Sequence, residues 1–254
     1  MAALPERATP LRRFLFLQGP HGPFFAELAA RLRLAGAGST RVAFNAGDAA
    51  MWRSAGSLVP WRAGPEAWAG SCGPLMDAHG ITDLVLYGDA RPIHAAAIDA
   101  AHARGLAVHV FEEGYLRPWW ATYERDGTNG NSRLMRLGID EMAAALDAAR
   151  PHRAAPERPP ARWGEMRRHM AWGAAYHAAL IAGRRRYPAF RPHRGVAPER
   201  EFALHLRRLA LLPVSAVGRA HATRRLIATA RPYHVLLMQL AHDASLLAHG
   251  PFAT

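Results

Sequence analysis

The segment LAVHVFEEGYLRP, residues 106–118, decides the fold that we expect for this chain. Residues 106–111 are small, branched or aromatic, with β-branched Val108 and Val110 and no breaker, which predicts a short buried strand. Glu112 and Glu113 follow where this strand is expected to turn into a loop, and Gly114 comes next, free to take unusual backbone angles. Ligands of open α/β sheets bind beyond the carboxyl ends of the strands. The two carboxylates are therefore expected at a binding edge.

Two chemical interpretations of this acidic pair are open. Neighbouring carboxylates disfavour each other's ionisation, so that one can keep a proton near neutral pH and act as an acid or base. Alternatively, one or both simply pair with Arg117 or cap a helix, because structural ion pairs also perturb carboxylates.

The rest of the first 105 residues repeats a strand, loop and helix pattern. Strands are expected at 14–17, 41–45 and 82–87, and helices at 24–35 and 94–103. Alternation with short connections predicts an α/β fold with a Rossmann-like parallel sheet and flanking helices. Gln18, Asp89 and the two glutamates then all follow strand ends, so that they should lie along one edge of the sheet.

The loop QGPHGP, residues 18–23, separates the first expected strand from its helix. Free backbone N–H groups at such a helix start can approach an anion or a sugar closely. The loop is neither a GxGxxG nor a Walker sequence, which disfavours nucleotide-cofactor dehydrogenases and P-loop enzymes. A plain tight turn would have the same composition.

The stretch after Pro118, WWATYERDGTNGNSRL, contains the turn-forming pairs Asp126-Gly127 and Asn129-Gly130. Its amide, hydroxyl and aromatic groups suit a hydroxyl-rich ligand, although a surface loop closed by its own side chains would look similar. Farther along, a short helix is expected at 140–150, a linker at 151–160, helices from 162 to about 212 with an interruption at 184–195, and a strand at 233–240.

The 254 residues, half of them hydrophobic, suffice for one large or two small domains. The single Cys72 excludes an internal disulfide and a cysteine-only metal site, and we expect no metal. There is no secretory signal at the start and no apolar run long enough to span a bilayer, so a cytoplasmic protein is expected.

The positive charge is concentrated in the C-terminal part of the chain. Residues 1–150 carry 15 arginines and 15 acidic residues, whereas residues 151–254 carry 17 arginines and 5 acidic residues. This asymmetry favours anionic partners such as lipid headgroups or phosphorylated sugars. Nucleic acid is disfavoured, because the arginine run lacks the interleaved aromatic residues on which bases stack.

Several stretches together resemble the capsule polysaccharide biosynthesis and export family, the bacterial β-Kdo glycosyltransferases, and most closely its S-type members. The stretches are FLFLQGPHGPFF at 14–25, FNAGD at 44–48, LYGDARPIH at 86–94, VFEEGYLRP at 110–118, NGNS at 129–132, YPAFRPHRG at 187–195 and LMQLAHDASLLAHGPF at 237–252. Each is a weak signal by itself, but all seven run in family order across nearly the whole chain.

The resemblance implies a GT-B-like fold and retaining transfer of Kdo from the donor CMP-Kdo to a (lyso)phosphatidylglycerol acceptor, without a further cofactor. It assigns Glu112 or Glu113 as general acid or base, and Asp89 as nucleophile or base. The residues that it implies for substrate binding are Gln18, Gly19, Arg91, His94, Gly114, Arg117, Asn129, Gln239 and Asp243. Arg91, His94 and Arg117 suit the Kdo carboxylate or a phosphate, although internal pairing with the acids remains an alternative.

The expected division is a Rossmann-like, acceptor-side domain at 1–150, a Pro- and Arg-rich linker with a basic helical segment at 151–231, and the start of an incomplete donor-binding domain at 232–254. Family members continue into a full second domain with an HP motif, so little or no transfer is expected from the 254 residues alone. A catalytically silent interaction protein of the capsule assembly complex is the alternative function.

The resemblance also implies a location at the membrane. The expected position is peripheral, on the cytoplasmic face of the inner membrane, with capsule assembly or export proteins as possible partners. Arg184, Arg185, Arg186, Arg191 and Arg194 are expected to contact the anionic membrane surface.

Overall fold

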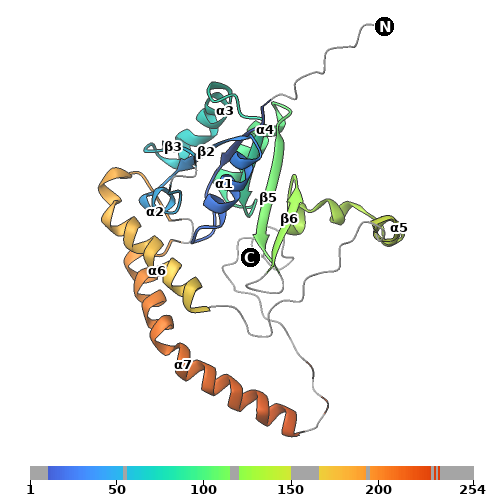
Figure 1. Ribbon diagram of the computed structural model, residues 1–254, viewed down its shortest axis with the longest axis vertical. Helices are drawn as coiled ribbons and strands as arrows, with labels where there is room; N and C mark the ends of the chain where they lie inside the picture. Colours follow the sequence, from blue (N-terminus) through green and yellow to red (C-terminus); the bar gives the residue numbers. More distant parts are fainter. Residues whose placement is uncertain are drawn as a thin grey trace.

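The computed structural model describes residues 11–53, 56–114, 120–149, 166–192 and 195–229, together with residues 232 and 234. Figure 1 shows one twisted sheet with helices on both faces, and two long helices, α6 and α7, that run away from one end of the strands. The predicted linker at 151–160 and, apart from His234, the predicted strand at 233–240 lie outside the described residues, as do Arg117, Arg194, Gln239 and Asp243.

The sheet has the strand order β3-β2-β1-β4-β5-β6. The first five strands of this order are parallel, and β6 is antiparallel to β5. The strands are β1 (Arg13–Phe16), β2 (Gly38–Ala43), β3 (Ser57–Pro60), β4 (Asp83–Tyr87), β5 (Ala107–Glu113) and β6 (Ala121–Arg125). The order 3-2-1-4-5 is that of a Rossmann sheet, so the predicted Rossmann-like α/β fold is confirmed.

The helices connect and cover the strands. They are α1 (Phe24–Leu34), α2 (Ala46–Ala50), α3 (Trp68–Ala78), α4 (Pro92–His102), α5 (Ile139–Ala149), α6 (Met166–Ala182) and α7 (Pro198–Thr229), with 3₁₀ turns η1 (Pro65–Ala67), η2 (Asn129–Asn131), η3 (Arg133–Arg136) and η5 (Arg184–Arg186). The helices predicted at 24–35, 94–103 and 140–150 are confirmed to within about two residues.

Three features of the fold were not predicted. Strand β3 and helix α3 occupy the connection between β2 and β4, where Gly70, Gly73 and Pro74 mask the helical pattern. Strand β6 lies in the stretch expected to be turn-rich, because pairing with β5 provides partners for its backbone. Helix α7 continues through Pro213 to Thr229, whereas the sequence suggested an end near 212.

The core has two layers, one on each face of the sheet. Leu84, Leu86, Val108 and Val110 face the layer that contains Trp68 of α3 and Ala97 of α4. The other layer contains Val85, together with Phe16 and Phe25 of β1 and α1, and Phe111 packs against it. Even-numbered residues of β5 therefore face α3 and α4, and odd-numbered residues face α1, as the two-residue period of a strand requires.

A buried carboxylate, that of Asp83, lies at the amino ends of the strands. Asp83 accepts hydrogen bonds from Arg12, from the Thr82 hydroxyl at 2.6 Å and from His109 Nε2 at 2.7 Å. Burial opposes ionisation of Asp83, but these hydrogen bonds hold the pKa of its carboxyl below the usual value. Asp83 forms these hydrogen bonds with residues of the chain itself. The cluster therefore stabilises the amino ends of the strands, which lie opposite the candidate site.

Candidate functional site

The crevice expected in such a sheet lies between β1 and β4, where the strand order reverses. The loop after β1 contains Gln18, Gly19 and His21, and the turn after β4 contains Asp89 and Arg91. Glu112 and Glu113 stand at the carboxyl end of β5, which is the neighbour of β4. The parallel topology therefore brings the acidic and basic candidates to the same edge of the sheet.

The position expected for the two glutamates is wrong in one respect: they do not lie in a loop. Strand β5 continues through both residues, because β6 pairs with it, Glu112 opposite Thr122 and Glu113 opposite Ala121. Successive side chains of a strand point to opposite faces. Glu112 thus faces the α4 side and Glu113 the α1 side, so that the two carboxylates do not share one site.

Glu112 has the environment of a general acid or base. Burial raises the pKa of its carboxyl, and the charges of Glu113 and Asp89 act in the same direction. The hydrogen bond that Glu113 N donates to Glu112 Oε1, at 3.1 Å, and the nearby positive charge of Arg91 partly oppose this rise. Burial, rather than repulsion within the acidic pair, is the main cause.

The turn after β4 has a glycine where it approaches the Glu112 carboxylate. Gly88 has φ +71°, and a Cβ added there would lie 3.1 Å from Glu112 Oε2. His94, at the start of α4, is fully buried, and its Nδ1 lies 2.6 Å from the carbonyl oxygen of Gly88. The contact of His94 with the backbone of the turn favours a role in holding the turn. Its predicted contact with a substrate anion is untested.

Asp89 is buried and anchors the loop that follows β6. Its Oδ2 accepts hydrogen bonds from Thr128 N at 2.8 Å and from Asn131 Nδ2 at 3.2 Å. Asn129, between these two residues, takes the left-handed conformation with φ 52°. Asp89 thus organises the NGNS stretch at 129–132, whereas its predicted role as nucleophile or base is untested.

Three other candidates, Gln18, Gly19 and Gly114, have packing partners within the fold. A Cβ at Gly19 would lie 2.5 Å from the Phe25 ring, and one at Gly114 would lie 2.2 Å from the carbonyl oxygen of Trp120. Gln18 Nε2 donates to Asp48 Oδ2 at 3.2 Å. Each of these contacts accounts for the residue type at its position without a bound ligand. Each is also compatible with a bound ligand.

A buried polar network around Asp48 was not predicted. Besides Gln18, the Asp48 carboxylate accepts from Arg41 Nη2 at 3.2 Å, from Phe44 N at 3.1 Å and from the Tyr176 hydroxyl at 3.3 Å. Asn45 caps α2 by accepting from Asp48 N at 2.9 Å. Asn45 three residues before Asp48 is a pattern from which a helix cap could have been predicted, but the partner of Asp48 in α6 lies too far along the chain to be inferred.

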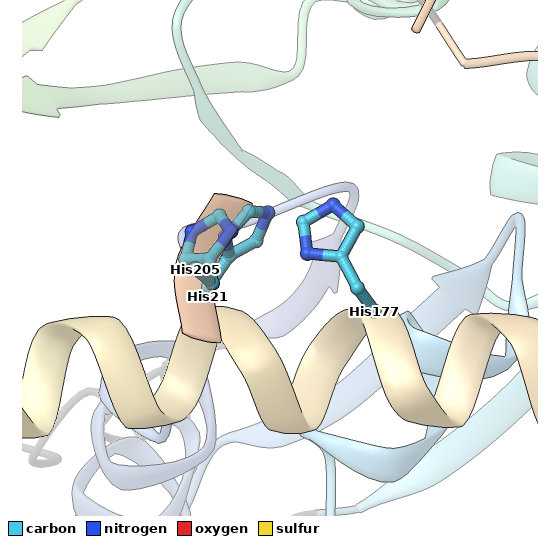
Figure 2. Close-up of side chains that lie close together, drawn as sticks. All are labelled: His21, His177 and His205. Carbon is cyan, nitrogen blue, oxygen red and sulfur yellow. The ribbon is translucent and has the colours of Figure 1, made fainter. Parts of the chain in front are cut away.

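Three histidines also meet close to the loop that follows β1. His21 belongs to this loop, His177 to α6 and His205 to α7, and one ring nitrogen of each lies within 4.8 Å of the others (Figure 2). His21 is the H of QGPHGP, but no spacing in the sequence links it to the other two. Only the packing of α6 and α7 reveals this cluster.

The surface is hollowed at another position, between α2 and the segment that follows α6. The cavity there measures about 310 Å³, and its lining includes neither Glu112, Asp89 nor Arg91. It is lined by Asn45, Ala46, Leu180, Ile181, Arg184, Tyr187, Pro188, Phe190, Pro192, Pro198 and Glu199. This cavity is therefore separate from the acidic edge of the sheet.

Comparison with known proteins gives consistent matches. The model of a family described as "Capsule polysaccharide biosynthesis protein" matches residues 82–254. The capsule polysaccharide export protein KpsS of Escherichia coli is 29% identical over 244 residues, which are 95% of this chain and 60% of the relative. The capsule polysaccharide modification proteins LipB of Neisseria meningitidis serogroups A and B are 30% identical over 181 residues, which are 71% of this chain and 42% of each relative.

The chain therefore spans about 60% of the length of KpsS. Within the described residues, no helix combines the length and the apolar character needed to cross a membrane.

Proposed function

The chain belongs to the capsule polysaccharide biosynthesis protein family, and from this premise we propose that it provides the acceptor-side, acid–base part of a glycosyl transfer. The donor in this proposal is CMP-Kdo, the acceptor is (lyso)phosphatidylglycerol, and the architecture of the whole enzyme is of the GT-B type. The observation that carries the proposal is the partly buried Glu112, whose carboxyl pKa is raised, at the carboxyl edge of the sheet.

Glu112 is the acid or base of the proposed reaction. A carboxyl whose pKa approaches the working pH can exchange a proton with an acceptor hydroxyl in the transition state, which typically accelerates a reaction by roughly 10²- to 10⁴-fold. Glu113 faces the opposite side of the sheet, where Phe111 packs against the α1 layer. The geometry thus favours Glu112 over Glu113, which the sequence left equal.

Arg91 provides a positive charge for an anionic substrate. It stands at the start of α4, half-buried, close enough to Glu112 and His21 to influence the pKa of both side chains. A guanidinium pairs well with a carboxylate or phosphate, and the (lyso)phosphatidylglycerol acceptor contains a phosphate. Arg91 therefore orients the acceptor in this proposal while it lowers the cost of ionising Glu112.

Because the proposed acceptor is a phospholipid, the proposed reaction takes place at a membrane surface. The arginines of η5 are suited to contact with such an anionic surface. Arg184, Arg185 and Arg186 are exposed at the end of α6. Each arginine close to an anionic surface adds roughly 1 kcal/mol to binding. The proposed location is accordingly peripheral, on the cytoplasmic face of the inner membrane, together with capsule assembly or export proteins.

Two measurements test this function. Calorimetric titration of the 254-residue protein with lysophosphatidylglycerol, below its micelle concentration, should detect acceptor binding. Release of CMP from CMP-Kdo should be slow or absent with this protein, and should appear when a CMP-Kdo-binding domain from a capsule relative is fused after residue 254.

Each outcome of these measurements has a clear meaning. Acceptor binding with no CMP release from the fused protein would favour the alternative, a catalytically silent partner in capsule assembly. Absence of both would refute the proposal. Rapid CMP release by the 254-residue protein would place the donor site within this chain. It would contradict the proposal that this chain provides only the acceptor side.

A further inference from the structure

The histidine cluster brings together three elements that are distant in sequence. Ring centroids are separated by 5.0 Å for His21 and His177, 5.1 Å for His177 and His205, and 6.0 Å for His21 and His205. In Figure 2, the His177 ring rises from α6 towards the other two, which come from the loop after β1 and from α7. Three imidazoles thus converge from three directions on a small volume.

Two of the three rings are oriented by the backbone. Nδ1 of His177 lies 2.8 Å from the carbonyl oxygen of Gly173, and Nδ1 of His205 lies 2.8 Å from that of Glu201. A carbonyl oxygen only accepts, so each ring donates through Nδ1–H and its Nε2 carries the lone pair. Metal-binding histidines are commonly held in this way, because the second hydrogen bond fixes both tautomer and ring direction.

A metal-binding imidazole must be neutral, and burial disfavours a protonated ring. His177 and His205 are each 7% exposed. One ring nitrogen of each histidine lies within 4.8 Å of the others, which is a spacing at which one divalent cation can contact all three rings.

The close approach of the helices depends on a glycine. A Cβ added at Gly173 of α6 would lie 2.1 Å from Cδ2 and 2.2 Å from Nε2 of His205. The absence of a side chain therefore lets the His205 ring lie against α6. A Cβ added at Gly22, whose φ is +132°, would lie 3.4 Å from Cγ of Trp172, so the loop that carries His21 runs close to the same helix.

We propose that His21, His177 and His205 form a binding site for a zinc-class divalent cation, which joins α6 and α7 to the loop after β1. Imidazole nitrogens suit Zn²⁺, and three histidines with one open position are a known zinc arrangement. No carboxylate belongs to the cluster among the described residues, so water or another oxygen ligand takes the fourth position. This site departs from the expectation of no metal and does not depend on the proposed transferase function.

The test uses the full chain, stripped with a chelator and then titrated with Zn²⁺ alone. One Zn²⁺ per chain should bind, and Co²⁺ in its place should give the intense visible absorption of a tetrahedral site. Loss of an outer-shell partner typically weakens metal binding roughly 10- to 100-fold, and loss of a ligand should cost more. His177→Gln and His205→Gln should therefore each weaken Zn²⁺ binding by more than about 100-fold.

A matched control separates the site from surface histidines. His221→Gln on α7 removes an exposed histidine from one of the same helices and should leave affinity unchanged. Circular dichroism reports whether each variant folds. His21→Gln changes a loop residue rather than a helix residue, and it remains informative if the helix variants unfold.

The proposal is overturned if wild type takes up no stoichiometric Zn²⁺, or if the His21→Gln variant binds as tightly as wild type. A Co²⁺ complex that lacks tetrahedral absorption would also overturn it, and that measurement needs no variant. A higher melting temperature of wild type with excess Zn²⁺, absent from His205→Gln, would support the joining role.

Discussion

The hydroxyl of Tyr176 donates a hydrogen bond of 3.3 Å to Oδ1 of Asp48, across 128 residues of the chain. Asn45 Nδ2 also reaches this hydroxyl, at 2.8 Å, and the Tyr176 ring fills the space that a side chain at Gly47 would need. Burial raises the pKa of the Tyr176 phenol, as does the charge of Asp48. The tyrosine thus remains a donor, and it fastens α6 to the turn between β2 and α2.

Tyr176→Phe should lower the free energy of unfolding by about 1–3 kcal/mol, because Asn45 and Asp48 lose a buried hydrogen-bond partner. Urea denaturation followed by circular dichroism measures this change. Tyr187→Phe removes a hydroxyl for which the described residues provide no hydrogen bond, and it should change stability by less than about 0.5 kcal/mol. Equal effects of the two substitutions would contradict the importance of the network.

Glu112→Gln should slow Kdo transfer by roughly 10²- to 10⁴-fold in the fused protein that contains a donor domain, because an amide cannot exchange the proton. Glu113→Gln is the matched control, and it should retain most of the rate because its side chain faces α1. The measurement is the initial rate of CMP release at saturating donor. A larger loss from Glu113→Gln would reverse the assignment of the acid.

Glu112→Gln should also change how stability depends on pH. Because burial raises the folded-state pKa of Glu112 above its ordinary value of 4.5, its contribution to stability is present below that value and is lost as pH rises through the folded-state pKa. The ionised carboxylate therefore weakens the fold at neutral pH. Glu112→Gln should melt higher than wild type at pH 7, with the difference shrinking below about pH 4.5.

Melting temperatures between pH 4 and pH 8 check this dependence. Glu66→Gln changes an exposed glutamate and should show no comparable trend. A Glu112→Gln protein that is less stable than wild type at neutral pH would show that the charge pairing with Arg91 outweighs the burial cost.

Asp89→Ala should loosen the loop that follows β6, because Thr128 N and Asn131 Nδ2 lose their shared acceptor. Hydrogen bonds to a charged group contribute about 1.5–3 kcal/mol, so amide exchange at 126–132 should accelerate by at least about tenfold. Hydrogen exchange read by mass spectrometry measures this change. Asp99→Ala, an exposed aspartate on α4, should leave the loop unchanged.

Replacing Arg184, Arg185, Arg186, Arg191 and Arg194 by Gln should reduce binding to phosphatidylglycerol vesicles, because each arginine contributes roughly 1 kcal/mol near an anionic surface. Cosedimentation at low and high salt measures the loss. Gln in place of Arg200, Arg207, Arg208, Arg219 and Arg224 of α7 removes equal charge and should have a smaller effect. Equal losses would mean that overall charge, rather than this segment, drives binding.

The sequence by itself determined the Rossmann-like unit. Mainly apolar, strand-like segments lie at 14–17, 82–87 and 106–111, each separated from the next by a helix or a longer connection. A parallel sheet is the efficient way to bury their side chains. The strand ends then converge on one edge, which places Gln18, Asp89 and the two glutamates in the same region before any coordinates are known. This inference is local, because it needs only periodicity and the handedness of short connections.

Tertiary structure decided where each side chain lies at that edge and which residues it contacts. Pairing with β6 extends β5 through Glu112 and Glu113 and assigns them to opposite faces, which no pattern within 106–118 could reveal. Asp48 with Tyr176, and His21 with His177 and His205, come together only when α6 and α7 pack beside the sheet. The periodicity of apolar residues along a strand or helix predicts which face a side chain occupies. The residue that it contacts on that face comes from a distant part of the chain, and contacts of that kind leave no local signal in the sequence.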